Sequence, residues 1–180
     1  KIAAELVIAF LTVYVLNTHT GPLSLVGLYT FPLWFSKVIS ALWILGIINA
    51  FNLIDGIDGL AGGISLVSIV SLALIAGTAG SYSLVILCLI LSGSIVGFLI
   101  PNMPPAKIFM GDTGSLFLGS TMALISLYVA REISGSRAVL VMPLIMGIPI
   151  IEVLVSMVRR YFKADDKRYS LFKRIRTMAK

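Results

Sequence analysis

Long apolar runs, separated by short breaks rich in glycine, proline or polar residues, follow one another along the whole of this sequence. A helix that crosses a membrane needs about 20 consecutive, mostly apolar residues. Six runs reach or approach that length, at residues 2–16, 31–53, 60–76, 82–100, 115–130 and 138–158. The pattern predicts an all-α fold in which residues 1–180 form one integral membrane domain, a polytopic transmembrane helical bundle with about six spans.

The first run and the loop that follows it depart from this simple pattern. Residues 2–16 are short for a span and contain Glu5, so we expect this helix to begin upstream of Lys1, in a longer protein. The loop at 17–30 alternates leucines with other residues, which is typical of a small β-hairpin.

The composition agrees with a membrane protein. Of the 180 residues, 58% are hydrophobic and 12% are charged, and the mean hydropathy is +1.04. A soluble domain has about half apolar and a quarter charged residues. The lipid bilayer is therefore the expected surroundings of most of the chain.

Positive charge is concentrated at the end of the chain and sets the orientation. Residues 159–180 carry nine Lys or Arg against two Asp. Basic loops beside a span face the cytoplasm and its anionic headgroups, so we expect a cytoplasmic basic loop and no nucleic acid partner. Counting spans back from this loop places residues 54–60 and 101–114 on the cytoplasmic face. The loops at 17–30, 77–82 and 131–137 then face outward.

The stretch 49–63, NAFNLIDGIDGLAGG, interrupts the second apolar run with polar residues. Two amides and two carboxylates recur at a constant spacing of three: Asn49, Asn52, Asp55 and Asp58. A carboxylate at the centre of a transmembrane helix costs about 2.5–3.5 kcal/mol. In a helix this spacing steps the four side chains round one face, whereas unwinding at Gly56 and Gly59 places them along a turn. In the plainer interpretation the two acids only cap helices or form turns.

A second informative segment, residues 104–119, reads PPAKIFMGDTGSLFLG. It places Lys107 and Asp112 at the mouth of the fifth run, and Gly111 and Gly114 leave room for a phosphate or a metal to approach the backbone. The simpler alternative is that Asp112 is the N-cap of the following helix.

The two segments together predict phosphate chemistry at one membrane face. Three carboxylates, two amides and a lysine converge there, and Mg²⁺ is typically held by one or two carboxylates together with substrate phosphates. This combination favours a cation-dependent membrane enzyme. Two alternatives stay open: a secondary transporter that uses the acidic, glycine-rich turns, and a structural membrane subunit in which they only cap helices.

The wording of both segments resembles the polyprenyl-phosphate N-acetylhexosamine-1-phosphate transferase family. Its members are multi-span bacterial glycosyltransferases that use Mg²⁺ to move a sugar phosphate from a UDP-sugar onto undecaprenyl phosphate. The resemblance is to the branch that primes teichoic-acid and lipopolysaccharide O-antigen synthesis with GlcNAc. The related phospho-MurNAc-pentapeptide transferases typically have threonine where Ile54 stands.

This resemblance implies a role for each matching residue. Asp112 would be the Mg²⁺ ligand, with Mn²⁺ as a substitute. Catalytic roles would fall to three polar residues of the first motif, Asn52, Asp55 and Asp58. Substrate-binding positions would be Asn49, Gly56, Ile57, Lys107 and Phe109. Phe109 matches an aromatic residue that stacks on uracil; otherwise it is a core or interfacial residue, and Lys107 otherwise extends along the membrane interface.

The resemblance also implies what kind of protein this is and where it differs from the family. It implies a multi-pass protein of ten or eleven spans in the bacterial inner (cytoplasmic) membrane, with its active site facing the cytoplasm. The family's upstream Asp-Asp pair is absent, and its histidine-rich motif is not found in 159–180, so we expect a segment of the whole enzyme. The exact sugar, the choice between direct transfer and an aspartyl intermediate, and the oligomeric state stay open, with a homodimer as one possible assembly.

Overall fold

The computed structural model describes residues 2–15, 24–25, 29–30 and 32–133, together with a few positions between 142 and 155. The elements are α1 (Ile2–Phe10), a π-helical segment (Leu11–Val15), β1 (Ser24–Leu25), β2 (Tyr29–Thr30), α2 (Leu33–Ile54), α3 (Leu60–Thr78), α4 (Tyr82–Asn102) and α5 (Gly111–Glu132). The predicted all-α fold is confirmed for this part of the chain.

Four of the predicted spans are confirmed. Helices α2 to α5 are each 19–22 residues long and apolar enough to cross a membrane. The first predicted span corresponds to α1 and its π-helical extension, and the predicted hairpin is present as the antiparallel pair β1–β2. Most of the predicted sixth span at 138–158, and all of the basic loop at 159–180, lie outside the described residues.

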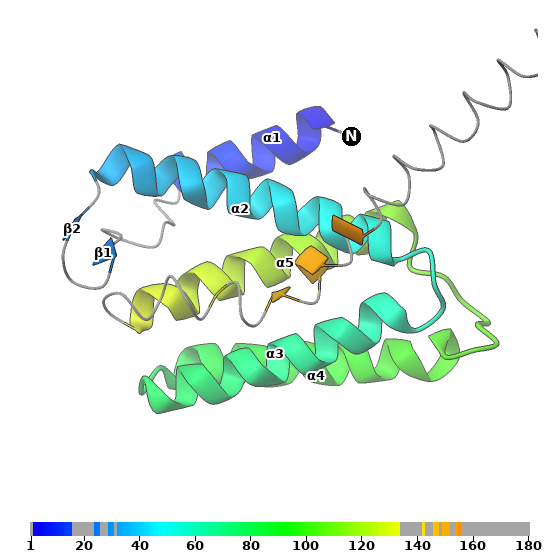
Figure 1. The fold of residues 1–180 in the computed structure, drawn as a ribbon. Helices are drawn as coiled ribbons and strands as arrows, with labels where there is room; N and C mark the ends of the chain where they lie inside the picture. The colour runs from blue at the N-terminus through cyan, green and yellow to red at the C-terminus, as the bar shows by residue number, and fades with distance from the viewer. Residues whose placement is uncertain are drawn as a thin grey trace, which may run out of the picture.

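The helices pack as two pairs, α2 with α5 and α3 with α4, and the pairs contact each other through α3 and α5. Helix α1 lies against α2. Figure 1 shows the α2–α3 turn and the α4–α5 loop at one end of the bundle, and the β-hairpin and the α3–α4 turn at the other. The two informative segments of the sequence therefore share one end of the molecule, as predicted.

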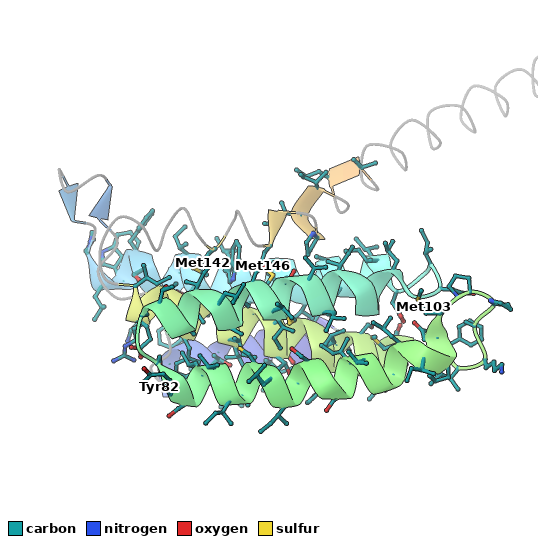
Figure 2. All side chains as sticks on the ribbon, turned by 90° about the horizontal axis from the view of Figure 1, so that it is seen from below. Tyr82, Met103, Met142 and Met146 are labelled. Atoms are coloured by element: carbon teal, nitrogen blue, oxygen red, sulfur yellow. The ribbon has the colours of Figure 1, made fainter. Side chains whose placement is uncertain are left out.

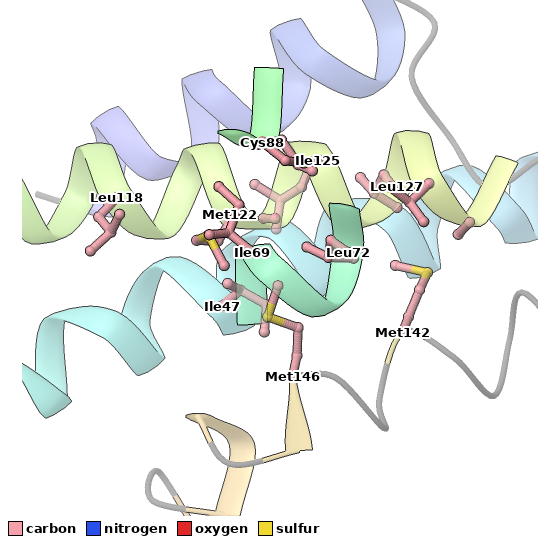
Figure 3. Close-up of a cluster of buried hydrophobic side chains, with 14 of the residues drawn as sticks. Ile47, Ile69, Leu72, Cys88, Leu118, Met122, Ile125, Leu127, Met142 and Met146 are labelled. Atoms are coloured by element: carbon pink, nitrogen blue, oxygen red, sulfur yellow. The ribbon is translucent and has the colours of Figure 1, made fainter. Parts of the chain in front are cut away.

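The core is apolar, and so is much of the outer surface. Ile47 of α2, Ile69 of α3 and Met122 of α5 are buried in one cluster between the helices (Figure 3). On α4, side chains project outward along the helix (Figure 2), and Ile90 and Ile100 are 62% and 77% exposed. A helix that is apolar on all sides suits a hydrocarbon solvent or packing against other membrane helices.

Helices α2 and α5 approach closely at a glycine. A Cβ atom at Gly119 would lie 2.9 Å from the Cα of Ile48 and 3.2 Å from the Cβ of Phe51. Farther along the same interface, the indole Nε1–H of Trp43 donates a 2.9 Å hydrogen bond to the Oγ of Ser126. Small residues let helices pack closely in a membrane, where water supplies no hydrophobic force between them.

This close approach predicts a position-specific effect of adding one methyl group. Gly119→Ala should lower the Tm of the detergent-solubilised protein, because the new Cβ meets backbone atoms and overpacking costs about 1–3 kcal/mol. The matched control is Gly97→Ala in α4, where a Cβ would meet nothing within 4 Å. Equal Tm values for the two variants would contradict the packing role of Gly119.

Candidate active site

The end of α2 and the beginning of α5 are joined by polar side chains. The Nδ2 of Asn52 donates to the Oδ1 of Asp112 at 3.2 Å and to the Oγ of Ser115 at 3.0 Å. Asp55 caps the C-terminus of α2, and its carboxyl accepts a hydrogen bond from the backbone of Gly111. The fold thus brings residues of both sequence motifs into contact.

Asp55 and Asp112, which we call the acid pair, interact electrostatically. Burial raises the pKa of the Asp55 carboxyl above its ordinary value, the hydrogen bond from Gly111 opposes this, and the negative charge of Asp112 adds to the increase. Two carboxylates that repel each other in this way are stabilised together when a cation binds between or beside them. Asp112 is exposed and accessible to such a cation.

The donor set of this site fits Mg²⁺. Within the described residues, no three His, Cys, Asp or Glu side chains are grouped so that they could hold a metal. A site with one or two carboxylates needs further oxygen ligands, and Mg²⁺ usually takes these from water and substrate phosphates. The acid pair therefore fits a metal that arrives with, or is completed by, a phosphate substrate.

The start of α5 differs from the boundary that the apolar run predicted. The helix begins at Gly111, four residues before the run at 115–130, because the polar residues of the motif continue the helix. The N-cap is Met110, so the alternative in which Asp112 caps the helix is wrong. Asp112 lies in the first turn, where a negative charge is favourable beside the helix dipole.

The chain turns rather than continuing as a helix after α2. Residues 55–59, here called the Asp55 turn, connect α2 to α3, and Gly59 has a φ of 72°. A Cβ at Gly59 would also lie 3.1 Å from the Sδ of Met103. Gly56 and Ile57 are exposed on this turn. Each of the two arrangements left open by the three-residue spacing therefore applies to half of the motif: Asn49 and Asn52 lie on helix α2, and Asp55 and Asp58 lie on the turn.

Asp58 contacts a different partner from the acid pair. Its Oδ2 accepts a hydrogen bond from the backbone N–H of Ala106 at 3.2 Å. Ala106 belongs to residues 103–110, here called the Phe109 loop, which connects α4 to α5. Asp58 thus links the Asp55 turn to the Phe109 loop.

Asn49 is likewise directed to another element. Its Nδ2 donates to the Oε2 of Glu5 and to the carbonyl of Leu45, both at 2.9 Å. Glu5 is 2% exposed, and its Oε1 has no hydrogen-bond partner among the described residues. Sequence reasoning treated Glu5 only as an interruption of an apolar run, although a carboxyl in such a run already signals a specific partner.

The Phe109 loop presents its aromatic ring to the outside. Phe109 is 74% exposed, so it is not a core residue, whereas the alternative of an interfacial residue stays open. Lys107 is exposed too, and its backbone N–H donates to the carbonyl of Pro101 at 2.8 Å. An exposed aromatic ring three residues before Asp112 offers a flat apolar surface for a base.

Asn102 is a residue of this region that sequence reasoning did not single out. It ends α4, is 6% exposed and hydrogen-bonds with both the Asp55 turn and the Phe109 loop. The signal in the sequence was an amide two residues after the apolar run at 82–100 and two residues before Pro104.

The hydrogen bond between Asp58 and the backbone of Ala106 can be tested by mutation. Asp58→Ala should increase the rate of backbone hydrogen exchange in the Phe109 loop, because the Ala106 N–H loses its acceptor. Asp58→Asn is the matched control and should exchange like the wild type, since its side-chain oxygen can still accept. If the Asn variant exchanged as fast as the Ala variant, charge rather than this hydrogen bond would anchor the loop.

Known proteins are similar to this chain over most of its length. A family model described as glycosyl transferase family 4 matches residues 1–130. The chain is 41% identical over 127 residues to a Bacillus subtilis (strain 168) protein named probable undecaprenyl-phosphate N-acetylglucosaminyl 1-phosphate transferase, a match over 71% of this chain and 36% of that protein.

Two further relatives have a second name. Phospho-N-acetylmuramoyl-pentapeptide-transferase of Chloroherpeton thalassium is 43% identical over 101 residues, which is 56% of this chain and 26% of the relative. The protein of the same name from Amoebophilus asiaticus is 42% identical over 97 residues, 53% of this chain and 22% of the relative. The chain thus spans well under half the length of all three relatives.

Proposed function

The chain belongs to glycosyl transferase family 4, as its motifs predicted, and from that premise we propose that it is part of a Mg²⁺-dependent sugar-phosphate transferase. The proposed reaction moves GlcNAc-1-phosphate, or a related N-acetylhexosamine-1-phosphate, from a UDP-sugar to undecaprenyl phosphate. The names of the relatives support this class of reaction. The observation that carries the proposal is the acid pair, Asp55 and Asp112, at one end of a membrane bundle.

In this proposal Asp112 holds Mg²⁺, or Mn²⁺ in its place, beside the diphosphate. When bound, the ion would neutralise charge that develops on the phosphates during transfer. The Asn52 amide orients the Asp112 carboxylate through its 3.2 Å hydrogen bond. Gly111 has a φ of 67° and open space where a Cβ would stand, so a phosphate can approach the N-terminus of α5.

In the proposed reaction Asp55 acts as a proton acceptor. An oxygen of the lipid phosphate attacks the phosphorus that carries the sugar, the bond from this phosphorus to the bridging oxygen of the diphosphate breaks, and UMP leaves with that oxygen. Burial raises the pKa of Asp55, which suits a carboxylate that accepts a proton from the attacking phosphate. Asp58 and Asn49 remain proposed members of the site, each holding one wall of it through the contacts described above.

The Phe109 loop is the proposed base-binding element. The exposed ring of Phe109 would stack on uracil, and Lys107 would meet a phosphate of the nucleotide. Gly56 and Ile57 on the facing Asp55 turn are exposed and would complete the nucleotide site.

An apolar cavity beside α2 supports a lipid substrate. Its volume is about 340 Å³, and its walls are Ile39, Leu42, Trp43, Gly46, Ile47, Ala50, Ile150 and Leu154. The lining residues of α2 run from Ile39 to Ala50, which is five residues before Asp55. We propose that the prenyl chain of undecaprenyl phosphate binds in this cavity.

The same arrangement argues against the transporter alternative. Transporters usually place charged groups near the membrane midplane, in helices broken there. Here the acid pair lies where α2 ends and α5 begins, at one end of the bundle. We propose that this end faces the cytoplasm of a bacterium, on the side of the basic residues 159–180, for the first membrane step of cell-wall glycopolymer synthesis.

UMP release tests the function directly. Full-length protein, supplied with a panel of UDP-sugars, should release UMP only when undecaprenyl phosphate and Mg²⁺ are both present, and fastest with UDP-GlcNAc. Release without the lipid would indicate hydrolysis, and no release with any sugar would refute the proposal.

Asp112→Asn should abolish this UMP release while the Tm stays near that of the wild type. The amide keeps the size of the side chain but removes the charge that binds the cation. The matched control is Glu132→Gln, an exposed carboxylate at the opposite end of α5, which should stay active. An active Asp112→Asn variant would remove Asp112 from the metal site.

Phe109→Ala should weaken binding of UDP by roughly tenfold, as expected for loss of stacking and of apolar contact area. Phe109→Tyr should keep most of the affinity. Phe117→Ala is the matched control, because Phe117 is 65% exposed on the side of α5 and should not contact the nucleotide. Calorimetric titration with UDP measures all three, and wild-type affinity in Phe109→Ala would exclude stacking.

A further inference from the structure

The carboxyl group of Glu5 is buried on α1, the helix that packs against α2 (Figure 1), and is only half satisfied. Its Oε2 accepts a 2.9 Å hydrogen bond from the Nδ2 of Asn49, while its Oε1 is buried and receives no hydrogen bond from the described residues. A buried polar atom without a partner is destabilising, so its presence in a folded protein calls for an explanation. A leucine at this position would avoid that cost, which indicates that Glu5 has a role beyond stability.

The bond to Glu5 determines what the Asn49 amide can offer to a ligand. The amide nitrogen has two hydrogens, and it donates to Glu5 and to the carbonyl of Leu45, both at 2.9 Å. The oxygen is on the other arm of the planar amide. Among the described residues none donates to this Oδ1, and Asn49 is exposed. Asn49 therefore presents a hydrogen-bond acceptor and no free donor.

The position of Asn49 on α2 indicates which part of a substrate this acceptor meets. Asn49 lies one turn before Asn52, on the same side of the helix, and Asn52 bonds Asp112 of the proposed metal and diphosphate site. Ionised phosphate oxygens only accept, so they gain nothing from a further acceptor. The hydroxyls and the acetamido N–H of an N-acetylhexosamine are donors. Uridine has donors too, but its proposed site is the Phe109 loop, whose hydrogen bonds described above are with the Asp55 turn and α4.

We propose that Glu5 is a positioning residue that fixes the Asn49 amide, so that its Oδ1 accepts a hydrogen bond from a hydroxyl or the acetamido N–H of the transferred sugar. The inference rests on the proposed function and deepens it, since it assigns recognition of the sugar, and not of the nucleotide, to the contact between α1 and α2. Without Glu5 the amide is free to rotate, and the sugar loses a fixed acceptor.

The Glu5→Leu variant separates this role from packing, because stability and affinity should change differently. Leucine removes the unpaired Oε1 together with the bond, and the Asn49 nitrogen keeps Leu45 and can reach water, so the Tm should equal or exceed that of the wild type. Affinity for UDP-GlcNAc should fall roughly fivefold, as expected for one hydrogen bond, while affinity for UDP stays unchanged. Glu5→Gln, whose side-chain oxygen can still accept from Asn49, should keep the wild-type affinity.

The experiment uses full-length protein, calorimetric titration with UDP-GlcNAc and with UDP, and the kinetics of UMP release. Glu5→Leu should raise KM for UDP-GlcNAc about fivefold with little change in kcat. In an Asn49→Ala background it should add little further loss, because the amide that it positions is gone. Titration with UDP-glucose identifies the donor: a loss of the same size indicates a hydroxyl, and no loss indicates the acetamido N–H.

Ser126→Ala is the control for a purely structural hydrogen bond. It removes the acceptor of the Trp43 indole between α2 and α5, so it should lower the Tm without changing the affinity for UDP-GlcNAc or for UDP. A Tm of Glu5→Leu as low as that of Ser126→Ala would assign Glu5 to packing.

Three further results would overturn the proposal. They are wild-type affinity for UDP-GlcNAc in Glu5→Leu, an equal loss of affinity for UDP-GlcNAc and for UDP, and a loss of full size in the Asn49→Ala background. Failure of the wild type to bind UDP-GlcNAc would instead refute the proposed function itself.

Discussion

The packing of α2 against α5 is the constraint on which the candidate site depends. Gly119 lets the two helices approach until its Cα faces the backbone of Ile48, and this alignment brings the end of α2 beside the start of α5. At this spacing Asn52 donates hydrogen bonds to Asp112 and Ser115. Apolar contact between the helices therefore determines where the polar groups meet.

Polar groups in this bundle are placed where they can be paired or reached by water. The acid pair lies at helix ends, where a carboxylate can be solvated or can bind a cation, and not in the lipid-facing middle of a span. Asn49, Asn52, Asp58 and Asn102 each make a hydrogen bond to another segment. These bonds connect α1, the Asp55 turn, the Phe109 loop and α5, so the polar residues of the motifs also organise the end of the bundle.

The proposed function requires one small site to bind two very different substrates. The polar end offers a carboxylate pair, the N-terminus of α5 and an exposed aromatic ring, which suit a nucleotide diphosphate. The apolar cavity along α2 suits a prenyl chain. Helix α2 contributes to both features, since it lines the cavity up to Ala50 and its C-cap is Asp55.

The sequence by itself determined the membrane class, four of the spans, the family and the two motifs, because hydrophobic run length and motif wording are local properties. Tertiary structure decided which motif residues contact the start of α5 and which contact other segments. The three-residue spacing treats Asn49, Asn52, Asp55 and Asp58 alike, yet only Asn52 and Asp55 contact the start of α5. Asn49 pairs with Glu5, and Asp58 with Ala106. Asn102 also became visible only in the fold, because both of its partners belong to segments that packing, not sequence, brings to it.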